Sequence, residues 1–89
     1  MTDQAKNYIQ AMESATGTKL IDHTLPHYSG REGHKRYFRE IGYALNDFNE
    51  SDRKEIPQVF YGVYVKLCNL KPLLDIKEMM KEFRNTIPE

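Results

Sequence analysis

Residues 31–48 read REGHKRYFREIGYALNDF, and this stretch decides the expected fold. At about 100° per residue, its apolar side chains fall within one arc of about 120°. They are Tyr37, Phe38, Ile41, Ala44, Leu45 and Phe48. Just upstream, Ser29 and Glu32 have the spacing of a capping box, which satisfies the first N–H groups of a helix. The pattern predicts an amphipathic helix that begins after Ser29 and ends near Phe48.

The N-terminal side of this stretch predicts one helix followed by an irregular segment. Residues 3–15 have helical periodicity, with an apolar face made of Ala5, Tyr8, Ile9, Met12 and Ala15. Thr2 or Asp3 can cap this helix, and Gly17 is expected to end it in the left-handed conformation. In residues 18–29, Pro26 biases the backbone before it toward an extended form. We expect a loop there with one short turn or strand, anchored by Leu20, Ile21 and Leu25.

Two prolines divide the C-terminal side. Pro57 suits the first position of a helix, and residues 57–70 are apolar over most of a helical circumference, which is typical of a buried helix. A strand is the alternative for this segment, because it is rich in β-forming residues. Pro72 is expected to open a last helix that runs to about Asn85. Its apolar face would be made of Leu73, Ile76, Met79, Met80 and Phe83.

These elements predict an all-α fold: a compact bundle of about four helices, with an irregular segment between the first and the second. The length of 89 residues fits a single helical domain, 1–89. The side chains expected to be buried are Phe38, Ile41, Leu45, Val63, Leu67, Ile76 and Phe83.

The overall charge narrows the classes of partner. The chain has 13 Lys and Arg against 13 Asp and Glu, so no global field draws it to nucleic acid or to an anionic membrane. No stretch approaches the ~18 apolar residues that span a bilayer, and residues 1–15 lack a signal-peptide pattern. A single cysteine, Cys68, excludes an intramolecular disulfide framework. We therefore expect a cytoplasmic protein without membrane association.

Catalytic and metal-binding patterns are weak. His23 and His27 have the four-residue spacing of two ligands on one helix face, but Pro26 between them argues against a regular helix. His34 falls on the apolar arc of its helix, where a hydrogen-bonded histidine is more common than a ligand. Cys68, within an apolar helix, is expected to be unreactive. The sequence predicts no catalytic residue, no metal, no cofactor and no enzymatic activity.

The most specific polar feature is a basic stripe. Arg31, Lys35 and Arg39 recur every four residues along one helix edge, with Arg36 further round. The basic stripe could contact an acidic surface of a protein partner or the phosphates of a nucleic acid; the third interpretation is a solvated helix face. Tyr43 is expected beside it as an exposed aromatic anchor. Because exposed charges usually change stability by only about 0.5 kcal/mol, we expect the stripe to be dispensable for folding.

A second apolar edge is formed by Tyr61, Val65 and Cys68. Another helix covers it, or it is the interface of a homodimer or of a partner complex. The residues expected to bind a partner are Arg31, Lys35, Arg36, Arg39, Tyr43, Tyr61 and Val65. The hypothesis is a small protein-binding module, acting as a regulator, adaptor or inhibitor, of the kind common among phage and mobile-element proteins. Nucleic-acid binding through the basic stripe is the alternative.

Overall fold

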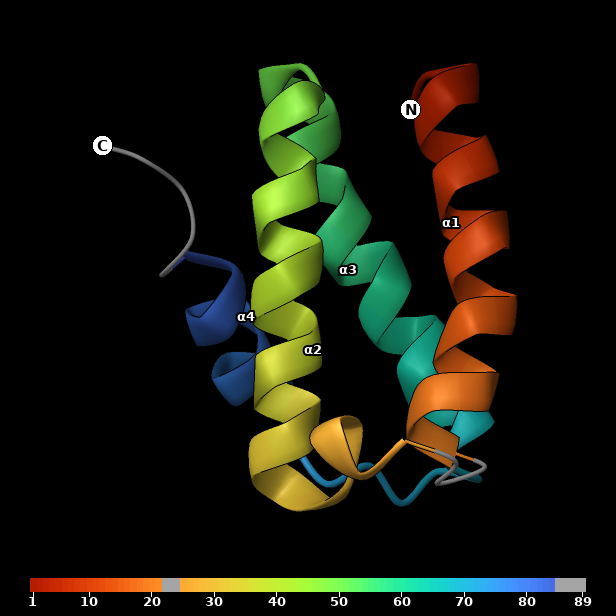
Figure 1. Ribbon diagram of the computed structural model, residues 1–89. Helices are drawn as coiled ribbons and strands as arrows, with labels where there is room; N and C mark the ends of the chain where they lie inside the picture. The colour runs from red at the N-terminus through yellow and green to blue at the C-terminus, as the bar shows by residue number, and fades with distance from the viewer. Residues whose placement is uncertain (22–24, 85–89) are drawn as a thin grey trace.

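The computed structural model describes residues 1–21 and 25–84 (Figure 1). Over this part the chain is all-α, with α1 at Asp3–Thr16, α2 at Gly30–Ala44, α3 at Glu50–Leu67 and α4 at Ile76–Arg84. Three short turns lie between them: η1 (Gly17–Ile21), η2 (Pro26–Tyr28) and η3 (Leu45–Asp47). α4 packs chiefly against α2, and α1 packs against α3. The predicted fold class, including the irregular segment after the first helix, is confirmed.

Aromatic rings form the centre of the core. Phe38 of α2 is fully buried and meets the rings of Tyr64 at 4.9 Å, Phe83 at 5.9 Å and Phe60 at 6.0 Å between centroids. Edge-to-face and tilted pairs of this kind add to the stabilisation from buried area. Ile41 and Leu45 are buried on the same face of α2. The burial predicted for Phe38, Ile41, Leu45 and Phe83 is therefore confirmed.

The start of α1 is as predicted, but its end is not. The Thr2 hydroxyl accepts a hydrogen bond from the Ala5 N–H at 3.1 Å and caps the helix. Gly17 stays right-handed, with φ −56° and ψ −45°, and its N–H bonds to carbonyls of the preceding turn. The predicted left-handed stop at Gly17 is wrong, because the chain winds on through η1 as a π turn. This extra turn buries Leu20.

α2 begins after Ser29 as predicted, but the predicted capping box does not form. The hydroxyl of Ser29 donates to the Pro26 carbonyl at 2.9 Å and makes no cap on the helix. Gly30 has φ 71°, a conformation that glycine adopts without strain. At Gly33 a Cβ atom would lie 2.2 Å from the Tyr28 carbonyl carbon. The glycine at position 33 therefore lets η2 pack directly on the backbone of α2.

The third helix begins earlier than predicted. Asn49 caps α3 by accepting the Asp52 N–H at 2.7 Å, so the helix opens at Glu50 and Pro57 lies inside it. Residues 50–56, which precede the predicted start at Pro57, are therefore helical. The carboxylate of Asp52 accepts hydrogen bonds from the hydroxyl and the N–H of Thr2. This long-range contact holds the first turn of α3 against α1. Because α3 is helical through Leu67, the strand alternative for residues 57–70 is excluded.

The buried face of α3 is rotated from the predicted one. Ile56, Phe60 and Tyr64 are fully buried at four-residue spacing. Val63 and Leu67, expected in the core, are half-buried, and Val59 is 43% exposed. The helix ends at Leu67, where Asn69 and Leu70 have positive φ angles. Leu70 is 78% exposed beyond the end of the helix. The continuation of this helix to Leu70 is wrong.

The last helix begins at Ile76, not at Pro72. Asp75 and Glu78 form the capping box here: Asp75 Oδ1 accepts the Glu78 N–H at 2.8 Å, and Glu78 Oε1 accepts the Asp75 N–H at 3.3 Å. Leu74, Met79 and Phe83 are buried, whereas Ile76, predicted to be buried, is 45% exposed. The predicted end at Asn85 lies outside the described residues.

No helix of the described part combines the length and the apolar character needed to cross a bilayer.

Candidate functional site

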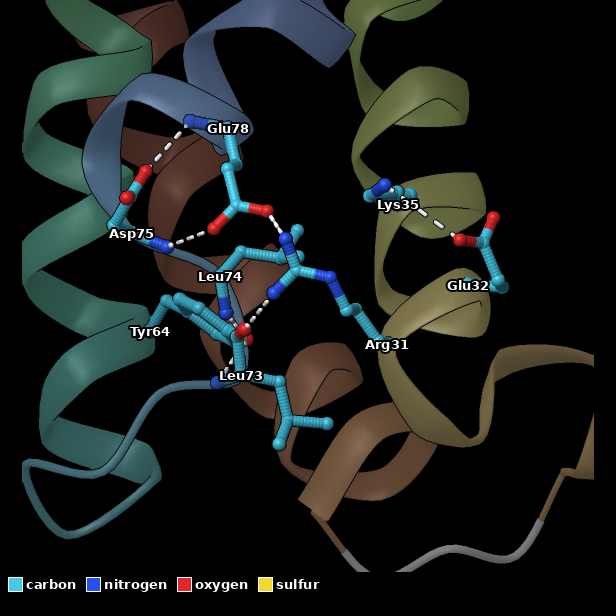
Figure 2. Close-up of polar contacts among 8 residues, drawn as sticks. All are labelled: Arg31, Glu32, Lys35, Tyr64, Leu73, Leu74, Asp75 and Glu78. Atoms are coloured by element: carbon cyan, nitrogen blue, oxygen red, sulfur yellow. Dashed lines mark hydrogen bonds and ion pairs between the residues drawn. The ribbon is translucent and has the colours of Figure 1, made fainter.

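The basic stripe of α2 lies along the edge that faces α4. Arg39 donates from Nε and Nη2 to Oε2 of Glu82, at 3.2 Å and 2.8 Å. The Glu82 side chain is only 7% exposed. One turn earlier on α4, Glu78 pairs with Arg31, which also donates to the Leu73 carbonyl at 2.8 Å (Figure 2). The two arginines thus join α2 to α4 through carboxylates of the last helix.

Lys35, the remaining cation of the stripe, and the neighbouring Arg36 also have partners within the chain. Lys35 lies 3.5 Å from a carboxylate oxygen of Glu32, within the same helix. Arg36 donates to the His27 carbonyl at 2.6 Å and so closes η2. A partner that binds the stripe must compete with these contacts. The structure therefore gives the basic stripe a role in packing helices, whatever else it binds.

The aromatic residues predicted for partner binding differ in exposure. Tyr43 on α2 is 60% exposed. Tyr61 and Val65 are half-buried on α3, with the Tyr61 ring 6.2 Å from that of Tyr64. The Tyr43 side chain is therefore exposed to a larger fraction than either Tyr61 or Val65.

A polar cluster inside the bundle centres on the Tyr64 hydroxyl (Figure 2). This oxygen accepts the N–H groups of Leu73 at 3.0 Å and Leu74 at 3.3 Å. It also lies 2.8 Å from Nδ1 of His34. Because both acceptor positions of the hydroxyl are taken, its own proton must point to His34, and Nδ1 is the acceptor. The cluster fixes the chain between α3 and α4, and His34 has the hydrogen-bonded role expected for it.

The remaining residues singled out for chemistry do not converge. His23 lies outside the described residues, and the exposed His27 places Nε2 3.5 Å from Glu40. Cys68 is a half-buried free thiol whose pKa is raised by burial. Within residues 1–21 and 25–84, no three metal-ligating side chains come together.

Sequence reasoning missed a groove between α3 and α4. It measures about 380 Å³ and is bounded by the first turns of α3 and the last turn of α4. Its apolar floor is made of Leu45, Pro57, Met80 and Phe83. Gln58 and three cations, Arg53, Lys54 and Arg84, complete the lining. The groove depends on α3 starting at Glu50, so the predicted start at Pro57 concealed it.

No known protein family, no curated protein and no solved structure matches this chain. Its function is therefore inferred from the residues and their geometry.

Proposed function

We propose that this protein is a small binding module that works by occupying a surface of another protein, as a regulator, adaptor or inhibitor. The groove between α3 and α4 carries the proposal. It combines an apolar floor with polar groups at its rim, the composition common to protein-binding surfaces. The one free thiol, Cys68, is compatible with a cytoplasmic setting, which is part of the same proposal.

The test is partner capture with a variant that fills the groove. Gln58 is exposed and lines the groove, so Gln58→Trp should block it without disturbing the core. Gln4→Trp adds the same ring at an exposed position of α1 and is the matched control. We expect the wild-type protein to retain a defined partner, the control to retain it equally, and Gln58→Trp to lose it by about tenfold or more. Retention by both variants would exclude the groove, and absence of any partner would contradict the binding function.

The surface around Tyr43 is a second candidate, because its ring is 60% exposed on α2. Tyr43→Ala in the same capture experiment separates the two surfaces. Nucleic-acid binding has less support, since Arg31 and Arg39 already contact carboxylates of α4. Salt-sensitive retention on immobilised nucleic acid, lost on reversal of the stripe charges, would favour it instead.

A further inference from the structure

The groove between α3 and α4 continues along the outer face of α4. A second hollow, of about 420 Å³, is lined by Ile76, Lys77, Met80 and Arg84. It shares Met80 and Arg84 with the first, so the two hollows adjoin. Ile76 and Met80 are four residues apart and make an apolar strip along it, with Ile76 45% exposed. We call this combined surface the α4 groove.

The charged residues described along the α4 groove are all positive. Its cations are Arg53, Lys54, Lys77 and Arg84, and none of the described residues that line it is acidic. Lys54 has a partner in Glu50 at 3.4 Å, but both side chains are about three-quarters exposed, where such a pair holds little energy. Arg53 and Arg84 make no ion pair with the described residues.

The arrangement of charges on α4 explains this excess. Glu78 and Glu82 face α2, where they pair with Arg31 and Arg39. The two carboxylates of α4 are therefore paired with α2, whereas Lys77 and Arg84 line the groove. A neutral chain thus presents one locally positive, partly apolar surface.

We infer that the α4 groove holds an acidic amphipathic helix of the protein partner, an assignment that rests on the function proposed above. The apolar strip along Ile76 and Met80 matches one face of such a helix, and the cations beside it match carboxylates on its flanks. Base stacking is less well supported, because Phe83, the aromatic residue of the lining, is only 1% exposed.

The direct test uses synthetic peptides. A helical peptide with leucines on one face and glutamates on its flanks is labelled and titrated by fluorescence anisotropy. Versions with glutamine or lysine in place of glutamate share its apolar face. We expect saturable binding of the glutamate peptide, about tenfold or more weaker binding of the other two, and weakening by salt. Equal affinity for all three peptides would overturn the assignment, and so would stronger binding of a single-stranded oligonucleotide.

Charge-reversal variants localise the binding. Lys77→Glu with Arg84→Glu changes two exposed cations of the α4 groove. Lys6→Glu with Lys66→Glu makes the same change in net charge at exposed positions of α1 and α3. The groove variant should weaken glutamate-peptide binding by about tenfold and the control by less than about twofold. Equal weakening by both variants would mean that only the overall charge matters, which contradicts the assignment.

The outcomes separate this inference from the proposed function. If no peptide binds but Gln58→Trp still loses the captured partner, the binding function stands and the acidic helix is excluded. If neither experiment shows binding, both fall.

Discussion

At the residue scale, the Tyr64 hydroxyl links three segments of the chain at one end of the bundle. It joins α3 to His34 of α2 and to the backbone at Leu73 and Leu74. We expect Tyr64→Phe to lower the free energy of unfolding by about 1–3 kcal/mol, because the change strands buried N–H groups while keeping the ring. Denaturant unfolding measures this. The control is Tyr61→Phe on the same helix, which should leave stability nearly unchanged. A Tyr64→Phe variant as stable as this control would show that the hydroxyl cluster contributes nothing.

Gly33→Ala tests the packing of η2 on α2, because helix propensity and close packing predict opposite changes in stability. Helix propensity alone predicts that Gly33→Ala gains about 1 kcal/mol. The Cβ would instead lie 2.2 Å from the Tyr28 carbonyl carbon, and neither backbone can move without separating η2 from α2. We expect a loss of about 1–3 kcal/mol, typical of overpacking, seen as a lower Tm. Gly62→Ala has open space around it in α3 and should raise the Tm; a rise for both variants would refute the close packing.

At the scale of elements, the Arg39–Glu82 pair binds α2 to α4. Arg39→Glu would bring a second carboxylate to a side chain that is only 7% exposed. The sequence alone suggests that this substitution changes the free energy of unfolding by about 0.5 kcal/mol. From the structure we expect the free energy of unfolding to fall by about 2 kcal/mol or more, because the buried charge of Glu82 loses its partner and its hydrogen bonds.

Reversing the pair separates this contact from net charge. Arg39→Glu combined with Glu82→Arg should recover a large part of the lost stability in thermal unfolding. Lys66→Glu, an exposed change of the same net charge, should melt close to the wild type. If the double variant is no more stable than Arg39→Glu alone, the two side chains do not act as a pair.

The helices themselves could be predicted, but several of their boundaries could not. Ser29–Glu32 and Asp75–Glu78 both have the spacing of a capping box, yet only the second forms. At the first of these, Gly30 has a positive φ and the Ser29 hydroxyl donates to the Pro26 carbonyl instead. Local sequence does not rank such competing hydrogen bonds, because their outcome depends on how η2 packs on Gly33.

Pro57 misled the prediction for a related reason. A proline inside a helix removes one hydrogen bond and usually costs about 3 kcal/mol. Here the Asn49 cap and the contact of Asp52 with Thr2 hold the preceding turns in α3. Thr2 and Asp52 are 50 residues apart in sequence. The groove between α3 and α4 could not be foreseen for the same reason, since it exists only because these turns are helical.

The candidate site shows the same limit. The recurrence of Arg31, Lys35 and Arg39 could be found from spacing, and so could the exposure of Tyr43. The position of Glu78 and Glu82 opposite the arginines could not be found in this way. Arg31 and Glu78 are 47 positions apart in the sequence, and Arg39 and Glu82 are 43 positions apart. Periodicity gives the faces of one helix, whereas the partner of each face depends on how the helices cross.

For the molecule as a whole, burial of tyrosines predicts alkaline unfolding. Burial raises the pKa of Tyr37 and of Tyr64 to about 12, against 10.0 in an unfolded chain. The folded state thus holds two protons that the unfolded state releases between pH 10 and pH 12, so stability is retained below pH 10 and falls above it. At about 1.4 kcal/mol per pKa unit, the loss reaches roughly 5 kcal/mol.

Circular dichroism across this pH range, with tyrosinate absorbance, checks the prediction. Helicity should fall together with the ionisation of the buried tyrosines. Tyr43→Phe removes an exposed hydroxyl and should leave the midpoint unchanged. Ionisation of all tyrosines near pH 10 with the helices intact would contradict it.

The position of Cys68 makes the chain its own reporter of local motion. This thiol is the only one in the sequence, and it lines a cavity of about 230 Å³ with Leu67 and Leu73 where α3 ends. Partial burial and a raised pKa slow the reaction of this thiol in the folded state, and opening of its surroundings speeds it. The alkylation rate of Cys68 therefore reports how often this end of the bundle opens, without any engineered label. A rate that tracks global unfolding would mean that the end opens only with the entire molecule, and a faster rate would mark it as a separate unit that opens first.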